Sequence, residues 1–204
     1  MIPAQEALER LRSGNRRFVT EKTSRDSGST RSRRDELMSG QMPFAVILGC
    51  SDSRVPAEIV FDQGLGDLFV IRVAGNIVAP SLIGSVEFAV DMFDTRLVVV
   101  LGHSECGAVS ATLEELRRPT EERSPNLQAI VDRIVPSIET LTKDGVERAP
   151  EELLDAAVRA NIHASVEGLR HGSELLEAEI DNHHLQIVGA EYSLETGVVD
   201  FFDV

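Results

Sequence analysis

The chain has 204 residues, of which 42% are hydrophobic, with a mean hydropathy of −0.05 and a formal net charge of −14. This length suits one domain around a single core, so we expect residues 1–204 to form one unit. The negative charge argues against nucleic acid and anionic membranes as partners, and no apolar run approaches the roughly 20 residues of a membrane helix. Because the N-terminus also lacks the layout of a signal peptide, we expect a cytoplasmic protein.

The first 34 residues form a predicted N-terminal helical arm with a basic character. Apolar residues at helical spacing predict an amphipathic helix over 3–19, and the polar stretch Thr23–Arg34 predicts a linker or exposed loop. Residues 1–34 hold nine Lys/Arg and four Asp/Glu, a net charge of +5, which leaves −19 on the rest of the chain. Two interpretations stay open: a solvated arm, or an arm that lies on the acidic face of a second subunit.

From Phe44 onward, apolar runs alternate with helical patterns. The runs that predict strands contain almost only apolar residues, which is typical of a parallel sheet covered on both faces. The sequence therefore predicts an α/β fold with a mostly parallel β-sheet flanked by helices. The expected strands are Phe44–Gly49, Leu68–Arg72, Leu97–Gly102, Leu185–Glu191 and, after a hairpin-like return, Val198–Phe202. The expected helices are Pro56–Asp62, 81–93, Ala108–Leu116, Leu127–Leu141, Glu152–Leu169 and Glu174–Ile180.

Two polar clusters that contain both cysteines of the chain follow two of these strands directly. Cys50 follows the first strand, and His103 and Cys106 follow the third. Parallel strands present their carboxyl ends at one edge of the sheet, so we expect these three side chains to meet although they lie far apart in the sequence. Two thiolates and one imidazole suit zinc and leave its fourth position open, as in catalytic sites.

Asp52 and Arg54 follow Cys50 closely and complete the predicted site. The Asp52 carboxylate can point back at the metal, where it accepts a hydrogen bond from bound water or takes the fourth position itself. A bidentate pair with Arg54 would keep the carboxylate ionised and aimed, and could pull it off the metal.

Other interpretations of these residues stay open at this point. The cysteines could be core residues or a disulfide, the zinc site could be a closed structural site with Asp52 as fourth ligand, and Asp52–Arg54 could be a plain surface ion pair. The remaining histidines are expected to be structural or solvated. They are His163, His171, His183 and His184.

The two clusters resemble those of the β-class carbonic anhydrases. The similarity extends over nearly the whole chain and rests on 50–55 (CSDSRV), 69–76 (FVIRVAGN) and 102–107 (GHSECG). It implies one Zn²⁺ per subunit on Cys50, His103 and Cys106, with Asp52–Arg54 as the catalytic dyad. It also implies a homodimer as the minimum unit, often a homotetramer, in which the N-terminal helix crosses onto a partner.

The resemblance also places the chain in a subtype and assigns a substrate pocket. One subtype has a tryptophan three residues before the first zinc cysteine, as part of a non-catalytic bicarbonate site, and here that residue is Ile47. The other subtype binds substrate with a glutamine nine residues before that cysteine, and here that residue is Gln41. The remaining implied pocket residues are Phe69, Ala74, Phe88 and Gly107, with Ala74 and Phe88 differing from the Val and Tyr of many relatives.

The reaction implied by the resemblance is the reversible hydration of CO2 to bicarbonate and a proton. Zinc-bound hydroxide would attack the carbon against Phe69 and Phe88, while Gln41 and the backbone near Gly107 bind the oxygens. Two alternatives stay open: the same fold hydrolysing carbonyl sulfide or carbon disulfide, or a non-catalytic, zinc-stabilised scaffold protein.

Overall fold

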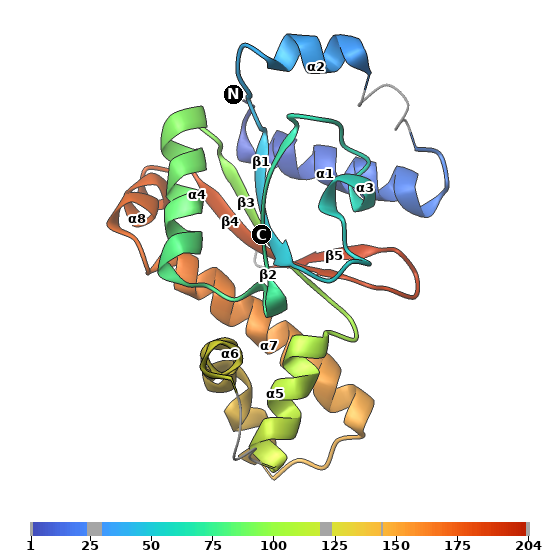
Figure 1. Cartoon of the computed structure of the whole chain (residues 1–204), viewed down its shortest axis with the longest axis vertical. Helices are drawn as coiled ribbons and strands as arrows, with labels where there is room; N and C mark the ends of the chain where they lie inside the picture. Colours follow the sequence, from blue (N-terminus) through green and yellow to red (C-terminus); the bar gives the residue numbers. More distant parts are fainter. Residues whose placement is uncertain (1, 24–29, 119–123, 144, 203–204) are drawn as a thin grey trace.

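A five-stranded sheet forms the centre of the computed structural model, which describes residues 2–23, 30–118, 124–143 and 145–202 (Figure 1). The strand order is β2-β1-β3-β4-β5, in which the first four strands run parallel and β5 pairs antiparallel with β4. The mostly parallel sheet and the hairpin-like return are thereby confirmed. The strands are β1 (Ala45–Cys50), β2 (Leu68–Val73), β3 (Leu97–His103), β4 (Gln186–Tyr192) and β5 (Val199–Phe202).

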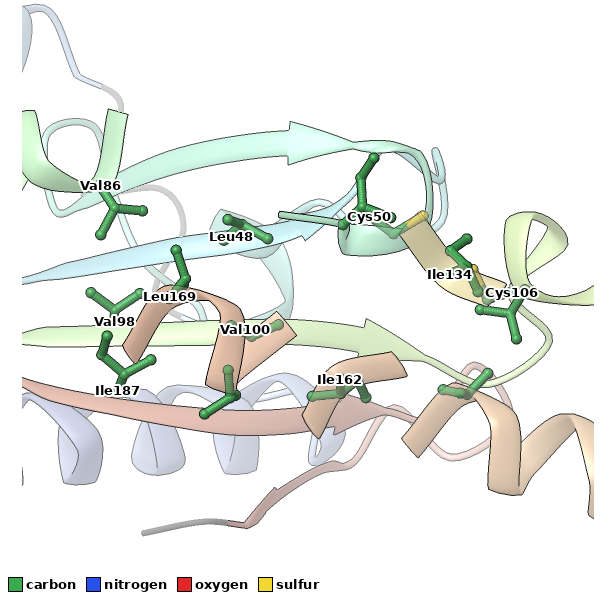
Figure 2. Close-up of a cluster of buried hydrophobic side chains, with 14 of the residues drawn as sticks. Leu48, Cys50, Val86, Val98, Val100, Cys106, Ile134, Ile162, Leu169 and Ile187 are labelled. Carbon is green, nitrogen blue, oxygen red and sulfur yellow. The ribbon is translucent and has the colours of Figure 1, made fainter. Parts of the chain in front are cut away.

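Helices cover both faces of this sheet, as the apolar strands require. Every residue of β1 and β3 is buried, because β1 lies between β2 and β3 while β3 lies between β1 and β4. The larger core, part of which Figure 2 shows, includes residues of α4 (Pro80–Phe93), α5 (Gly107–Arg117), α6 (Pro125–Lys143), α7 (Pro150–Arg170) and α8 (Glu174–Asp181). The core on the opposite face includes residues of α1 (Ala4–Val19) and α3 (Ala57–Val60).

The predicted N-terminal helix forms and packs on the sheet of its own chain. Leu8 and Leu11 of α1 are fully buried. The Asn15 side chain accepts a hydrogen bond from the Val199 N–H at 3.0 Å, which ties α1 to the edge strand β5. The basic residues of α1 also find acidic partners in the same chain, as the 2.6 Å ion pair between Arg17 and Asp62 illustrates. A solvated α1 is therefore the wrong interpretation.

The prediction of a linker over Thr23–Arg34 is wrong at its C-terminal end. Residues 24–29 lie outside the described residues, but α2 (Arg31–Leu37) is helical. Thr30 caps it by accepting a hydrogen bond from the Arg33 N–H at 3.2 Å. Its sequence, RSRRDEL, has no apolar residues at helical spacing, so no sequence pattern indicates the helix. None of its residues is buried.

Two further differences concern α7 and the end of β2. Helix α7 begins at Pro150, two residues before the predicted start, with proline in its first turn. A short 3-10 segment, η2 (Ala74–Asn76), follows β2 and was not predicted. Among the described residues, no helix is both long and apolar enough to cross a membrane.

Candidate metal centre

The two cysteine-bearing clusters meet at one edge of the sheet. Strands β1 and β3 are parallel neighbours, with Gly49 opposite Leu101, so Cys50 and His103 leave the sheet side by side. A turn through Glu105, whose φ is 56°, then brings Cys106 back to the same place at the start of α5. The two thiols and the imidazole offer ligand atoms that all lie within 4.8 Å of one another. The predicted convergence is confirmed, and Figure 2 shows Cys50 and Cys106 at one end of the core.

The imidazole of His103 is oriented as a metal ligand would be. Its Nδ1 lies 2.8 Å from the carbonyl oxygen of Ser104, so the other ring nitrogen faces the thiols. His103 is fully buried, and its Nε2 has no hydrogen-bond partner within the described part of the chain. A buried ring nitrogen without a partner is costly, and a metal ion would satisfy it.

The protonation chemistry of the two thiols also fits a cation. A hydrogen bond from Cys106 lowers the pKa of Cys50 to about 4 against the opposing effect of burial. The same bond raises the pKa of Cys106, which keeps its proton in the metal-free protein. Two buried thiolates in contact repel each other, and a dication removes that penalty. The donor set of two sulfurs and one imidazole nitrogen therefore fits Zn²⁺.

Asp52 lies next to this centre but is held by Arg54. The guanidinium makes two hydrogen bonds to the carboxylate, at 2.9 and 2.7 Å, and the Arg54 backbone N–H adds a third at 2.9 Å. Asp52 Oδ2 is 3.8 Å from the unpartnered Nε2 of His103. The hydrogen bonds from the Arg54 side chain hold the pKa of Asp52 well below its usual range. The carboxylate thus faces the metal centre, ionised, while Arg54 restrains it.

Arg72, which the sequence analysis did not single out, secures the loop that carries Asp52. From the end of edge strand β2, its guanidinium donates to the backbone carbonyls of Cys50 at 3.1 Å and of Asp52 at 2.6 Å. The Ser51 N–H continues the pairing by donating to the Val73 carbonyl at 3.2 Å. A lone arginine at the end of an apolar strand was the available sequence signal.

The predicted substrate residues divide into two groups. Ala74 and Gly107 lie at the metal centre, because Ala74 directly follows Val73, the β2 partner of Cys50, and Gly107 follows Cys106. Gln41 precedes the start of β1, whereas Cys50 is at the end of that strand. At roughly 3.3 Å per residue, Ala45 and Cys50 lie about 16 Å apart, so Gln41 is at the opposite end of β1 from the metal centre.

The aromatic pocket residues lie away from the metal centre of their own chain. Phe69 pairs with Val46 near the start of β1. Phe88 packs against Phe69 with ring centroids 6.3 Å apart, and it remains 50% exposed. Gln41 lines an open cleft of about 500 Å³ with residues such as Met38 and Leu65. Arg54 lines a different cleft, of about 760 Å³, and Gln41 does not contribute to the lining of that cleft. One chain therefore does not bring Gln41, Phe69 and Phe88 to its own metal centre.

Comparisons with known proteins identify related sequences and related folds. The sequence model of the family described as carbonic anhydrase matches residues 45–199. Carbonic anhydrase 2 of Mycobacterium tuberculosis is 40% identical over 191 residues, which cover 94% of this chain and 89% of that protein. The solved β-carbonic anhydrase CcaA matches with a TM-score of 0.75 and 28% identity over 96% of this chain and 95% of its own. One of two tetrameric β-carbonic anhydrases from Sordaria macrospora shares the fold, with a TM-score of 0.72 and 23% identity over 84% of this chain and 86% of its own.

Proposed function

Since the chain belongs to the β class of the carbonic anhydrase family, we propose that it hydrates CO2 reversibly at a zinc ion held by Cys50, His103 and Cys106. The observation that carries this proposal is the convergence of three buried ligand atoms within 4.8 Å, beside a carboxylate that is restrained by arginine. We place one Zn²⁺ in each subunit and the protein in the cytoplasm.

Zinc held by Cys50, His103 and Cys106 would supply a Lewis acid that lowers the pKa of water, toward about 7 in favourable sites, and would thereby make it a nucleophile for CO2. The residues around the metal would orient the attacking water and the substrate. Asp52, ionised and 3.8 Å from His103 Nε2, would accept a hydrogen bond from the attacking water and orient it. Arg54 would hold that carboxylate back from the metal through its hydrogen bonds, and the backbone near Gly107 would bind a substrate oxygen.

The direct test is CO2 hydration by the purified zinc-loaded protein, measured by stopped flow beside carbonyl sulfide and carbon disulfide. We expect CO2 to be the preferred substrate. A protein with full zinc occupancy and no CO2 hydration at neutral to alkaline pH would contradict the proposal. Turnover of the sulfur compounds alone would identify the related hydrolase, and turnover of none would identify a scaffold.

We also propose that a second subunit completes the substrate pocket. Gln41, Phe69 and Phe88 lie away from the metal centre of their own chain. Phe88 and its neighbour Met92 are also exposed on α4, beside edge strand β2. Apolar side chains exposed together in this way are typical of a subunit interface. A dimer that joins these faces would deliver all three residues to the partner's zinc, and two dimers would form a tetramer. Exchange of α1 between the subunits would keep the contacts of Leu8 and Leu11.

Mixed dimers test this arrangement. A Gln41→Ala subunit paired with a Cys50→Ser subunit should recover about half of the wild-type activity per dimer, because one site then combines intact ligands with an intact partner glutamine. The Gln41→Ala homodimer should be roughly tenfold less active, for the loss of one substrate hydrogen bond. CO2 hydration by dimers isolated with two affinity tags is the measurement.

The reciprocal pair is the matched control. A wild-type subunit paired with a Gln41→Ala, Cys50→Ser subunit should be as impaired as the Gln41→Ala homodimer per intact site. If this control retains half of the wild-type activity while the first pair does not, Gln41 serves its own subunit and the proposed pocket is wrong.

The pH dependence of activity should be set by the metal centre and not by Asp52. Because Arg54 holds the pKa of Asp52 well below its usual range, this carboxylate stays ionised at every pH where the protein is assayed. Two thiolates donate more charge to zinc than neutral ligands do, which weakens the acidification of water. We therefore expect kcat/KM for CO2 to rise with pH through the mildly alkaline range. A profile that is already flat from about pH 6.5 upward would contradict this expectation.

We assign the chain to the subtype that uses the pocket glutamine. Ile47 stands where the other subtype has its tryptophan, and it is fully buried in the core that α1 covers. We accordingly propose that bicarbonate does not inactivate this enzyme through a site at that position.

A further inference from the structure

Asn161 of α7 is a buried polar residue in the middle of the larger apolar core. It is only 2% exposed, and its neighbours along the helix, Val158 and Ile162, belong to that core. Burying an amide costs free energy unless the amide is hydrogen bonded. The Asn161 side chain meets this requirement by donating from Nδ2 to the backbone carbonyl of Gly75 at 2.8 Å.

Gly75 in turn contacts a proposed zinc ligand. Its backbone N–H donates to the sulfur of Cys50 at a donor–acceptor distance of 3.4 Å. The residue has a φ of 69°, and an added Cβ would lie 2.9 Å from Ile134 Cδ1 and 3.1 Å from Ala108 Cβ. A glycine is therefore required here on both conformational and steric grounds.

The same freedom makes Gly75 a poor support by itself. A glycine has the widest choice of backbone conformations, so its N–H keeps one direction only if other groups hold the residue. The Asn161 hydrogen bond restrains the carbonyl of Gly75, and Ile134 and Ala108 limit the space around its Cα. Helices α5, α6 and α7 thus act together on one glycine, whose N–H faces Cys50.

We propose that Asn161 is a positioning residue for the metal centre, which holds the Gly75 N–H against the Cys50 thiolate and thereby supports zinc binding. This inference rests on the proposed zinc site. An N–H donor near a metal thiolate fixes the orientation of the ligand and withdraws charge from the sulfur. In a centre with two thiolates, that withdrawal leaves the metal a stronger Lewis acid.

The test compares Asn161→Leu with Ser165→Ala. Leucine has a similar size and no donor, whereas Ser165 is another buried polar residue of α7, one turn further along. Zinc affinity is measured by competition with a chromophoric chelator, and the melting temperature is measured with and without zinc. We expect Asn161→Leu to bind zinc about 10–100-fold more weakly, the usual effect of losing a group that supports a metal ligand. The gain in melting temperature on adding zinc should shrink accordingly.

Cobalt substitution gives a readout that a purely structural role would not change. In the Co²⁺-loaded protein, loss of the N–H···S bond should shift the thiolate-to-metal charge-transfer band to lower energy, because the sulfur lone pair is less stabilised. Ser165→Ala should leave the band and the zinc affinity unchanged. If Asn161→Leu does not fold, Asn161→Ala, which leaves space and does not crowd Gly75, is used in the same comparison.

The outcomes separate this inference from the proposed function. If the wild-type protein binds no zinc, the proposed metal site fails and the role of Asn161 fails with it. If wild type binds zinc and the Asn161 variant binds it equally, with an unchanged cobalt band, only the positioning role is overturned. Equal losses of affinity in Asn161→Leu and Ser165→Ala would likewise overturn it, because they would show a general effect of disturbing α7.

Discussion

Replacing Cys106 by serine should remove bound zinc and lower CO2 hydration by roughly four orders of magnitude or more, close to the uncatalysed rate. Cys106 is 1% exposed, and its sulfur lies within 4.8 Å of the potential ligand atoms of Cys50 and His103, so its loss removes one of the three buried donors. A serine hydroxyl is a far weaker zinc ligand than a thiolate. Metal analysis and stopped-flow CO2 hydration on the same sample are the measurements.

Ser110→Ala is the matched control for Cys106→Ser. Ser110 is exposed on α5, and its backbone N–H, which alanine retains, donates to the Cys106 carbonyl at 2.9 Å. This variant should keep zinc and activity. Should Cys106→Ser retain one zinc per subunit and wild-type turnover, the assignment of Cys106 as a ligand would be wrong. X-ray absorption at the zinc edge should report two sulfurs and one nitrogen in wild type and one sulfur less in any residual zinc site of the variant.

Replacing Arg54 by methionine should lower kcat by roughly 100-fold or more, because the carboxylate that Arg54 restrains could then bind the metal and block the site. The Arg54 side chain supplies two of the three hydrogen bonds that restrain the Asp52 carboxylate. Without them the carboxylate, already 3.8 Å from His103 Nε2, is free to turn and occupy the fourth position on zinc. Zinc-edge spectroscopy should then show a carboxylate oxygen that wild type lacks at the same pH.

The chain contains a matched control for this variant. Asp94 and Arg96 form an ion pair at 3.1 Å with the same spacing as Asp52 and Arg54, but at the opposite end of the sheet, before β3. Arg96→Met should leave activity and the zinc spectrum unchanged. If Arg54→Met has no greater effect than Arg96→Met, the Asp52–Arg54 pair is an ordinary surface ion pair, as one of the sequence interpretations held.

The sequence predicted the features that depend on local patterns. Apolar runs such as 97–101 indicated buried parallel strands, and the structure buries every residue of β3. The topology of a parallel sheet then brings Cys50 and His103 to one edge, and the strand order, in which β1 and β3 are neighbours, places them side by side. The α2 helix was missed because all its residues except Leu37 are polar, so that a threonine cap and short-range ion pairs stabilise it.

The sequence by itself predicted which residues gather at one edge of the sheet: Cys50, His103 and Cys106 as the proposed zinc ligands, with Asp52 and Arg54 beside them. Only the tertiary structure showed which residues hold these groups in place, and that Gln41 of the same chain lies far from them. Arg72 and Asn161 contact backbone carbonyls, whose positions depend on the packing of β2 and α7, so the residue types alone do not reveal these contacts. The distance between Gln41 and the metal centre likewise follows from the length of β1. Each residue of a strand adds roughly 3.3 Å, so the two ends of β1 lie far apart.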